Sequence, residues 1–132
     1  MAQLNQPYGV FVSNGEVFIC DTFNHRVRKV LRNGQIVTIC GTGFPGYNGD
    51  GQLATHAQLN VPYSVVVSSS NQVYISDNAK EVNPCSIYIH HDELYFSNGY
   101  QLCKLGSHGN VETIAGIANE RGFNGDDMVA TE

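Results

Sequence analysis

The sequence is poor in basic residues, and it lacks both long apolar runs and closely spaced cysteines. Seven lysines and arginines face twelve aspartates and glutamates, so the 132 residues carry a formal net charge of -5. Nucleic-acid binding needs a basic surface, so we expect no nucleic-acid partner. No stretch reaches the roughly 18 apolar residues of a membrane-spanning helix, so we expect no membrane span. Residues 1–5 have neither a basic region nor an apolar run, which predicts no signal peptide.

Internal repeats organise the chain. The segment AQLNQPYGVFVSNGEVFICD (2–21) aligns with AQLNVPYSVVVSSSNQVYISD (57–77), so Pro7 corresponds to Pro62. A weaker third copy, NPCSIYIHHDELYFSN (83–98), places Pro84 at the same position and Asn98 where the strand-end aspartate is expected.

The downstream half of the unit also recurs. NGQIVTICG (33–41) matches HGNVETIAG (108–116), and YNGDGQLAT (47–55) matches FNGDDMVAT (123–131). The second match equates Gly49 and Asp50 with Gly125 and Asp126. The full repeat therefore extends well beyond the segment that contains the proline.

Each full unit predicts four short antiparallel strands. In the first unit they are expected over 9–12, 17–20, 26–31 and 35–40, and in the second over 63–67 and 73–76. Asn-Gly turns join the hairpins of the first unit, and such turns are strong hairpin signals. No stretch of ten residues shows helical periodicity. Units of this size with four strands are typical of β-propeller blades.

The repeat resembles the NHL family. The resemblance rests on Pro-Tyr-Gly-Val-x-Val (7–12), the apolar strand that ends in Asp21, NHRVRKV (24–30) and TICGTGFPGYNGDGQLATHAQLNVP (38–62). The last segment is similar to a long NHL variant that reads TIAG, GDG, AT and LNxP. The resemblance implies a β-propeller, usually of six blades, whose commonest role is to bind other macromolecules.

The second unit is shorter than the repeat predicts. Pro84 follows Pro62 too early for a four-stranded unit, so the expected organisation is a first blade (4–58), a half-blade (59–82) and a second full blade (83–132). The fold class is therefore all-β, a partial β-propeller of about two full blades and a half-blade. A true half-blade and a spliced or mispredicted gene product both fit the sequence. The open ends call for further repeats of a longer chain or for self-association that closes the ring.

Recurrence gives most of the polar candidates a structural role. We expect Asp21 and Asp77, at the ends of equivalent strands, to accept backbone N–H groups in the turn that follows, because repeats keep what stacking needs. The repeat motif comprises Pro7, Asp21, Gly49, Asp50, Pro62, Asp77, Pro84, Gly125 and Asp126.

The glycine-rich segment GFPGYNGDGQLATHAQLN (43–60) resembles a phosphate loop on first inspection. Its second copy replaces Gly51 with Asp127, and an added carboxylate would repel a phosphate. We instead expect a hinge between blades in which Asp50 caps a short helical segment, 51–58.

A pair of histidines and the four cysteines are candidates for a metal site and for disulfides. His90 and His91 fall in a predicted hairpin, where neighbouring residues of an extended chain point to opposite faces, so we expect no metal site. Cys20 and Cys40 lie on strands two and four of one blade, about 9 to 10 Å apart, whereas a disulfide needs less than about 7 Å. Cys85 and Cys103 are separated in the same way. Reduced thiols are expected, which favours a reducing compartment.

The sequence therefore predicts a non-catalytic scaffold for protein or ligand binding, with no catalytic residue, metal or cofactor. The loops after strands two and four share one face, and longer loops on a rigid scaffold tend to bind partners. The candidate binding residues are Phe23, Asn24, His25, Tyr47 and Phe123. A metal-dependent lyase-like or lactonase-like propeller enzyme is the alternative, and RNA binding is disfavoured by the net charge.

Overall fold

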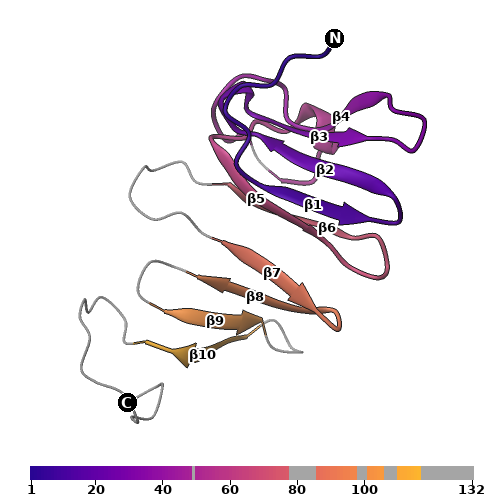
Figure 1. The fold of residues 1–132 in the computed structure, drawn as a ribbon. Helices are drawn as coiled ribbons and strands as arrows, with labels where there is room; N and C mark the ends of the chain where they lie inside the picture. The colour runs from indigo at the N-terminus through magenta and orange to yellow at the C-terminus, as the bar shows by residue number, and fades with distance from the viewer. Residues whose placement is uncertain (49, 78–85, 98–100, 106–109, 117–132) are drawn as a thin grey trace.

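The protein is all-β and forms part of a β-propeller. The computed structural model describes residues 1–48, 50–77, 86–97, 101–105 and 110–116. Within these residues the chain forms ten strands in three antiparallel sheets and two single-turn 3-10 helices. The three sheets follow one another from the N-terminal end of the molecule downwards (Figure 1).

The first sheet is a complete four-stranded blade. Its strands run in chain order, β1 (Val10–Ser13), β2 (Glu16–Asp21), β3 (Arg26–Val30) and β4 (Ile36–Cys40). The β1–β2 turn contains Asn14 and Gly15, both with positive φ (51° and 74°), as the Asn-Gly signal predicts. All four predicted strands are present and differ from the expected bounds by one residue at most.

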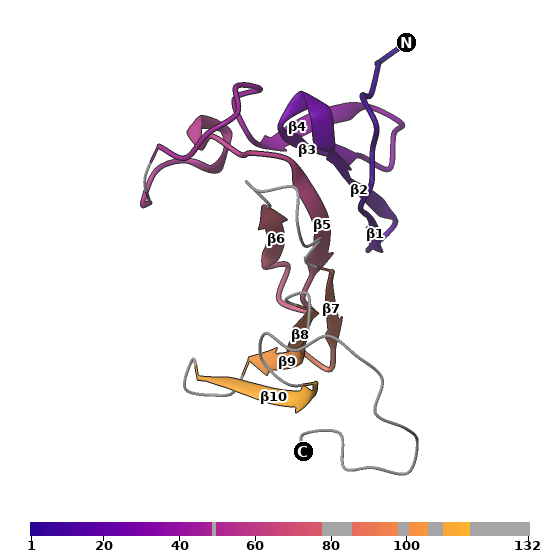
Figure 2. The same cartoon turned by 90° about the vertical axis from the view of Figure 1, so that its left-hand side faces the viewer.

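The second sheet has two strands and the third has four. The half-blade pairs β5 (Pro62–Val67) with β6 (Val73–Asp77), and the last blade contains β7 (Ile87–His90), β8 (Glu93–Ser97), β9 (Leu102–Leu105) and β10 (Val111–Ala115). The predicted half-blade is therefore seen as a separate two-stranded sheet between two four-stranded ones (Figure 2).

The best-packed core lies between the first blade and the half-blade. Its buried members come from both sheets and from the loop that joins them: Phe18, Cys20, Val27, Cys40, Leu59, Val65 and Val67. They point inward because β2 alternates between its two faces and presents Phe18 and Cys20 to the half-blade. Val73 and Ile75 of β6 pack against this cluster beside their cross-strand partners Val67 and Val65.

The inner strands of successive sheets touch closely. A Cβ atom on Gly9, just before β1, would lie 2.6 Å from the carbonyl oxygen of Tyr63 on β5, so only glycine fits there. At the equivalent position of β5, the Ser64 hydroxyl lies 3.4 Å from the backbone nitrogen of Ile87 on β7. The rings of Tyr8 and Tyr63 stack with centroids 5.1 Å apart. These contacts fix the spacing of neighbouring blades.

The described helices are single turns, and none has the length and apolar character needed to cross a membrane.

Candidate functional site

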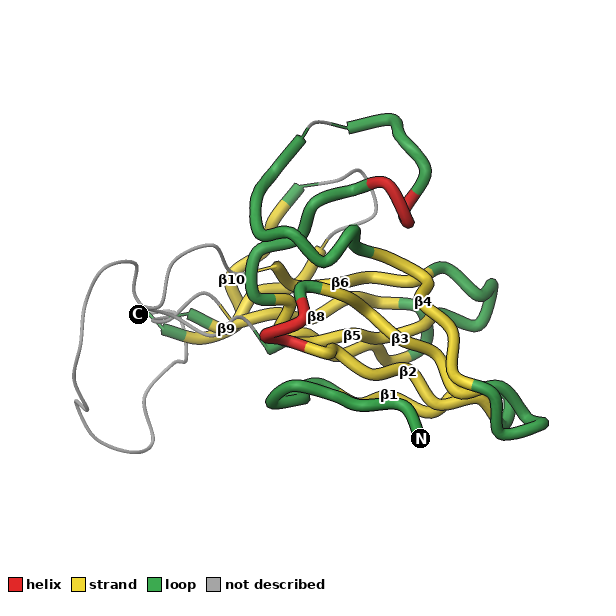
Figure 3. The backbone as a smooth tube through the Cα atoms, turned by 90° about the horizontal axis from the view of Figure 1, so that it is seen from above, coloured by secondary structure: helices red, strands yellow, loops and turns green. Residues whose placement is uncertain are grey.

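The ends of the strands form two surfaces, one made of the connecting loops and the other of hairpin turns. The loop face consists of the segments that follow β2 and β4, residues 22–25 and 41–61, at one end of the first blade. The hairpin face consists of the turns β1–β2, β3–β4 and β5–β6 at the opposite end, on the right of Figure 1. Seen from above, the described parts of the long segment, 41–48 and 50–61, project from the β4 side of the first blade, away from β1 (Figure 3).

Asp21 is a fully buried carboxylate at the end of β2. Its Oδ1 accepts the Asn5 backbone N–H at 2.8 Å, and both of its oxygens accept from Asn24 Nδ2 at 3.0 Å. The Arg28 guanidinium lies 3.6 Å from Oδ2. Asp21 thus joins the N-terminal segment, the 3-10 helix η1 (Thr22–Asn24) and β3.

Asp77 makes the equivalent contact in the half-blade. The Asn60 backbone N–H donates to both Asp77 oxygens, at 2.8 and 2.9 Å. Asp77 is exposed as a residue, yet desolvation of the carboxyl raises its pKa, while the Asn60 N–H and His25 act in the opposite direction. The prediction that Asp21 accepts a backbone N–H from the following turn was wrong, because its backbone donor is Asn5 and the turn contributes the Asn24 side chain. For Asp77 the same prediction falls on a turn that lies outside the described residues.

His25 connects the first blade to the half-blade. It ends η1 in the left-handed conformation (φ 51°), and its Nδ1 accepts the Val61 backbone N–H at 3.3 Å. The Thr22 hydroxyl crosses the same junction and donates to the Pro62 carbonyl at 2.8 Å. Asn24 and His25 are therefore held inside the scaffold by Asp21 and Val61.

Asn48 organises the long segment of the loop face. Its Oδ1 accepts the Gln58 backbone N–H at 2.8 Å, and its Nδ2 donates to the His56 carbonyl at 2.9 Å. The prediction that Asp50 caps a helix over 51–58 was wrong, because η2 spans only Ala54–His56 and begins after Leu53, with no side-chain cap. Sequence reasoning missed Asn48, although its recurrence as Asn124 was a usable signal.

Large apolar side chains are exposed on the loop face. Phe23 and Tyr47 are 46% and 75% exposed, and Phe44 and Leu53 are exposed to a similar degree. Tyr47 bonds to Asp50, and the Asp50 carboxylate raises the pKa of the phenol. The remaining candidates lie outside the described residues: Gly49, Pro84, Phe123, Gly125 and Asp126.

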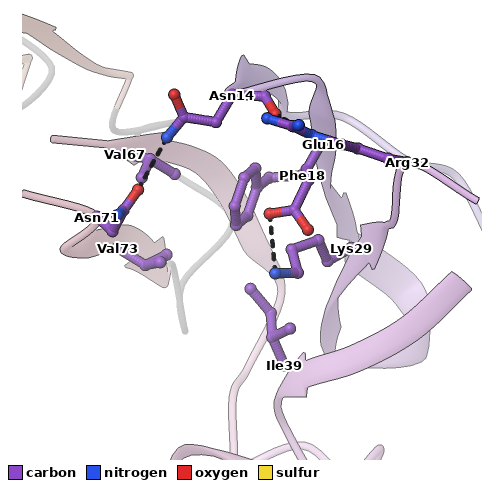
Figure 4. Close-up of a pocket in the computed structure, with 9 residues that line it drawn as sticks. All are labelled: Asn14, Glu16, Phe18, Lys29, Arg32, Ile39, Val67, Asn71 and Val73. Carbon is purple, nitrogen blue, oxygen red and sulfur yellow. Dashed lines mark hydrogen bonds and ion pairs between the residues drawn. The ribbon is translucent and has the colours of Figure 1, made fainter. Parts of the chain in front are cut away.

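A first cleft of about 510 Å³ opens on the hairpin face between the first blade and the half-blade (Figure 4). Its apolar lining is Phe18, Ile39, Val67 and Val73, and its polar lining is Asn14, Glu16, Lys29, Arg32 and Asn71. Lys29 pairs with Glu16 at 3.0 Å, while Asn14 Nδ2 donates to Asn71 Oδ1 at 3.1 Å across the two sheets.

A second cleft of about 390 Å³ lies between the half-blade and the last blade. Tyr74 lines it on one side and Leu94 and Leu105 on the other, together with the charged residues Asp92, Glu93, Lys104 and Glu112. Nearby, the Ser69 hydroxyl and backbone N–H donate to Asp92 and hold the pKa of that carboxyl below its usual value.

The rings of His90 and His91 lie close together, with centroids 4.0 Å apart. The prediction that they point to opposite faces was wrong, because His91 adopts the left-handed conformation (φ 48°) and the chain is not extended there. Within the described part of the chain, no group of three or more His, Cys, Asp or Glu side chains could hold a metal ion.

Cys20 and Cys40 are buried free thiols with raised pKa values. Burial, with a smaller effect of Asp77, raises the pKa of Cys20 from 9.0 to about 12. At pH 8 this change lowers the thiolate fraction about a thousandfold.

We expect iodoacetamide to label Cys20 in the folded chain at least about a hundredfold more slowly than in urea, measured by peptide mass spectrometry. Equal rates in the two conditions would contradict the buried environment.

No protein-family profile matches the chain. Among curated proteins, NHL repeat-containing protein 2 from Gallus gallus is 34% identical over 71 residues, which cover 52% of this chain and 10% of the relative. The Homo sapiens protein of the same name is 32% identical over 68 residues, covering 50% of this chain and 9% of the relative. The matched segment thus spans about a tenth of the length of these relatives.

Solved propeller-like structures resemble the fold. The virginiamycin B lyase of Staphylococcus aureus superimposes with a TM-score of 0.57 at 17% identity, covering 86% of this chain and 42% of the lyase. A streptogramin B lyase structure gives a TM-score of 0.58 at 13% identity, over 91% of this chain and 44% of the lyase. At these identities the likeness concerns the fold alone.

Proposed function

This chain carries NHL repeats and folds as part of a β-propeller, and on that premise we propose that it is a non-catalytic scaffold whose loop face binds a protein partner. The observation that carries the proposal is the set of exposed apolar side chains on loops that hydrogen bonds hold in place. Exposed apolar side chains are typical of protein-binding surfaces when they gather on one face, and aromatic residues are enriched in interface cores.

Hydrogen bonds anchor the backbone beside two of the exposed apolar side chains, Phe23 and Tyr47. Phe23 sits in η1, and its backbone N–H donates to the Asn5 carbonyl at 3.1 Å. Tyr47 precedes Asn48, whose side-chain amide bonds to the backbone of His56 and Gln58 at the far end of the long segment. A preordered surface loses less conformational entropy on binding, which favours affinity.

The two strand-end aspartates distinguish this role from the enzyme alternative. A metal-dependent propeller enzyme would need inward-facing ligands from several blades, and Asp21 and Asp77 are the strongest such pair. Their oxygens instead accept hydrogen bonds within the scaffold, from the Asn5 N–H and the Asn24 amide at Asp21 and from the Asn60 N–H at Asp77. A lyase or hydrolase activity that a chelator removes and a divalent metal restores would contradict the scaffold proposal.

The propeller itself is open at the first blade. Val10 and Val12, on the face of β1 that points away from the half-blade, are 67% and 64% exposed. Such residues are normally covered by the next blade. We propose that further repeats of a longer protein, or other copies of this chain, complete the ring.

Replacing the exposed aromatic side chains of the loop face should abolish partner capture. The double variant Phe23→Ala/Tyr47→Ala is expected to lower the recovery of loop-face partners about tenfold or more, because a few buried aromatic residues carry most binding energy. Quantitative mass spectrometry of affinity-captured proteins measures this loss.

Tyr88→Ala is the matched control, because Tyr88 is 61% exposed on β7 and lies off the loop face. Circular dichroism verifies that both variants remain folded. Capture that survives the double variant and is lost with changes at Arg32 and Asn71 would place the partner on the hairpin face instead.

A further inference from the structure

The outer edge of β6 lies in a recess. Within the described ranges the half-blade contains no strand after β6, whereas the blades on both sides continue through two more strands. Figure 2 shows β6 between the first blade above and β9 and β10 below. Among the described residues no strand pairs with the outer edge of β6, and an unpaired sheet edge is a template for adding a strand.

The two clefts lie on either side of this edge. The first cleft has Val73 of β6 in its lining, and the second has Tyr74. Because neighbouring residues of a strand point to opposite faces, a strand added beside β6 would direct alternate side chains into the two clefts. Both clefts are thus parts of one slot, the place that the third strand of a full blade would fill.

The complete blades show which residues a third strand contributes. In the first blade Lys29 of β3 is paired in register with Phe18 of β2 and lies over its ring, 5.7 Å from the centroid. In the last blade Lys104 of β9 is paired with Tyr95 of β8 and lies 6.0 Å from that ring. Each lysine also pairs with a glutamate at the start of strand two, Glu16 or Glu93.

The half-blade has the aromatic residue of this arrangement and no described lysine over it. Tyr74 occupies the place of Phe18 and Tyr95 in the repeat, and Gln72 occupies the place of the glutamate. The Tyr74 hydroxyl donates to Gln72 Oε1 at 3.2 Å, as the Tyr95 hydroxyl donates to Glu93. The second cleft, which Tyr74 lines, contains three carboxylate residues and one lysine, so its charge favours an incoming cation.

A second feature of the third strand is an apolar residue two positions before the lysine. Val27 precedes Lys29 in this way and pairs with Cys20, and Leu102 precedes Lys104 and pairs with Ser97. The equivalent position on β6 is Ser76. A strand that fits the slot therefore has an apolar-x-Lys triplet, with the apolar residue beside Ser76 and the lysine over Tyr74.

We propose that β6 accepts, in antiparallel pairing, an extended segment of another polypeptide with an apolar-x-Lys triplet. A folded second copy of this chain does not meet the requirement, because its two such triplets, in β3 and β9, are already paired within their own sheets. Addition of a strand to a sheet edge is a common mode of peptide recognition, with backbone bonds giving affinity and side-chain pockets giving specificity. This surface is separate from the loop face and extends the proposed function.

The test uses a fluorescein-labelled synthetic peptide, RVRKVLRNGQIVT, which copies residues 26–38 and contains the VRK triplet. Anisotropy titration against the 132-residue chain is expected to show saturable binding. Lys29→Glu in the peptide should weaken binding about tenfold, because it reverses the charge over Tyr74 and beside the carboxylates. Tyr74→Leu in the protein should weaken binding about fivefold through loss of the cation–π contact.

Tyr74→Phe retains the ring and is expected to restore binding, while Tyr88→Leu, outside both clefts, should leave it unchanged. Amide exchange should slow along Val73–Asp77 when the peptide binds, since pairing engages the outward N–H groups. The proposal is overturned if the peptide does not bind, if Tyr74→Leu binds as wild type does, or if protection appears elsewhere than β6. If the peptide displaced β3 from the first blade, protection would appear there instead of along β6.

Discussion

Asp21→Ala is expected to lower the free energy of unfolding by about 3 kcal/mol, as expected when one partner of a buried polar network is lost. The substitution removes the acceptor of the Asn5 N–H and of the Asn24 amide, and it leaves Arg28 without its carboxylate. Arg28 Nε is already buried without a hydrogen-bond partner, so the guanidinium has little alternative stabilisation. Urea unfolding followed by circular dichroism measures the change.

Asp77→Ala is the matched control, since it is the same substitution at the equivalent repeat position. Asp77 is exposed, and among the described backbone donors it accepts only the Asn60 N–H, so its loss should cost about 1 kcal/mol. Asp21→Asn keeps an acceptor for Asn5 and should fall between the two. Equal losses for the two alanine variants would show that burial of Asp21 does not determine its contribution.

Gly41→Ala is expected to destabilise the chain by about 3 kcal/mol, through positive φ and overpacking together. Gly41 has φ of 95°, and an added Cβ would lie 2.3 Å from the His25 carbonyl oxygen and 2.9 Å from Arg26 Cα. Both contacts are backbone atoms, of Arg26 in β3 and of His25 just before it. The clash can therefore be removed only if β3 and β4 move apart. The Gly41 N–H also donates to the Ala54 carbonyl at 3.0 Å, so the long segment should loosen as well.

Gly34→Ala separates the two contributions. Gly34 has φ of 83°, close to that of Gly41, but an added Cβ there meets no atom within 4 Å. Only the cost of the left-handed conformation remains, about 1 kcal/mol. Thermal and urea unfolding of the two variants should differ accordingly, and indistinguishable midpoints would show that the contact with His25 and Arg26 is relieved at no cost.

The sheets could be predicted from sequence because their signals are local. Val17 to Cys20 is a β-branched and aromatic run that favours a strand, and Asn14-Gly15 accepts the positive φ of a tight hairpin. Recurrence then showed that the second unit has two strands, and the comparisons support the NHL repeat and the propeller. The predicted NHL resemblance and fold class are confirmed.

The side-chain contacts were harder to predict because they depend on which backbone groups meet in space. Asp50 and Asn48 lie two residues apart and both can cap a turn, and only the folded segment shows that Asn48 reaches His56 and Gln58. Asp21 bonds to Asn5, sixteen residues away, because the N-terminal segment returns past the end of β2. The binding role of Phe23 and Tyr47 stays a prediction. No sequence motif indicates the two clefts, because they lie beside a sheet with only two described strands where the neighbouring blades have four.

The junction between the first blade and the half-blade also bears on how the chain folds. A two-stranded hairpin is marginal in water by itself, so β5 and β6 depend on their docking against the first blade. The Thr22 hydroxyl and the His25 ring hold Pro62 and Val61 at that junction, and Val65 and Val67 complete its core. The half-blade should therefore open only when it undocks, which makes it one cooperative unit with the first blade rather than an independent folding element.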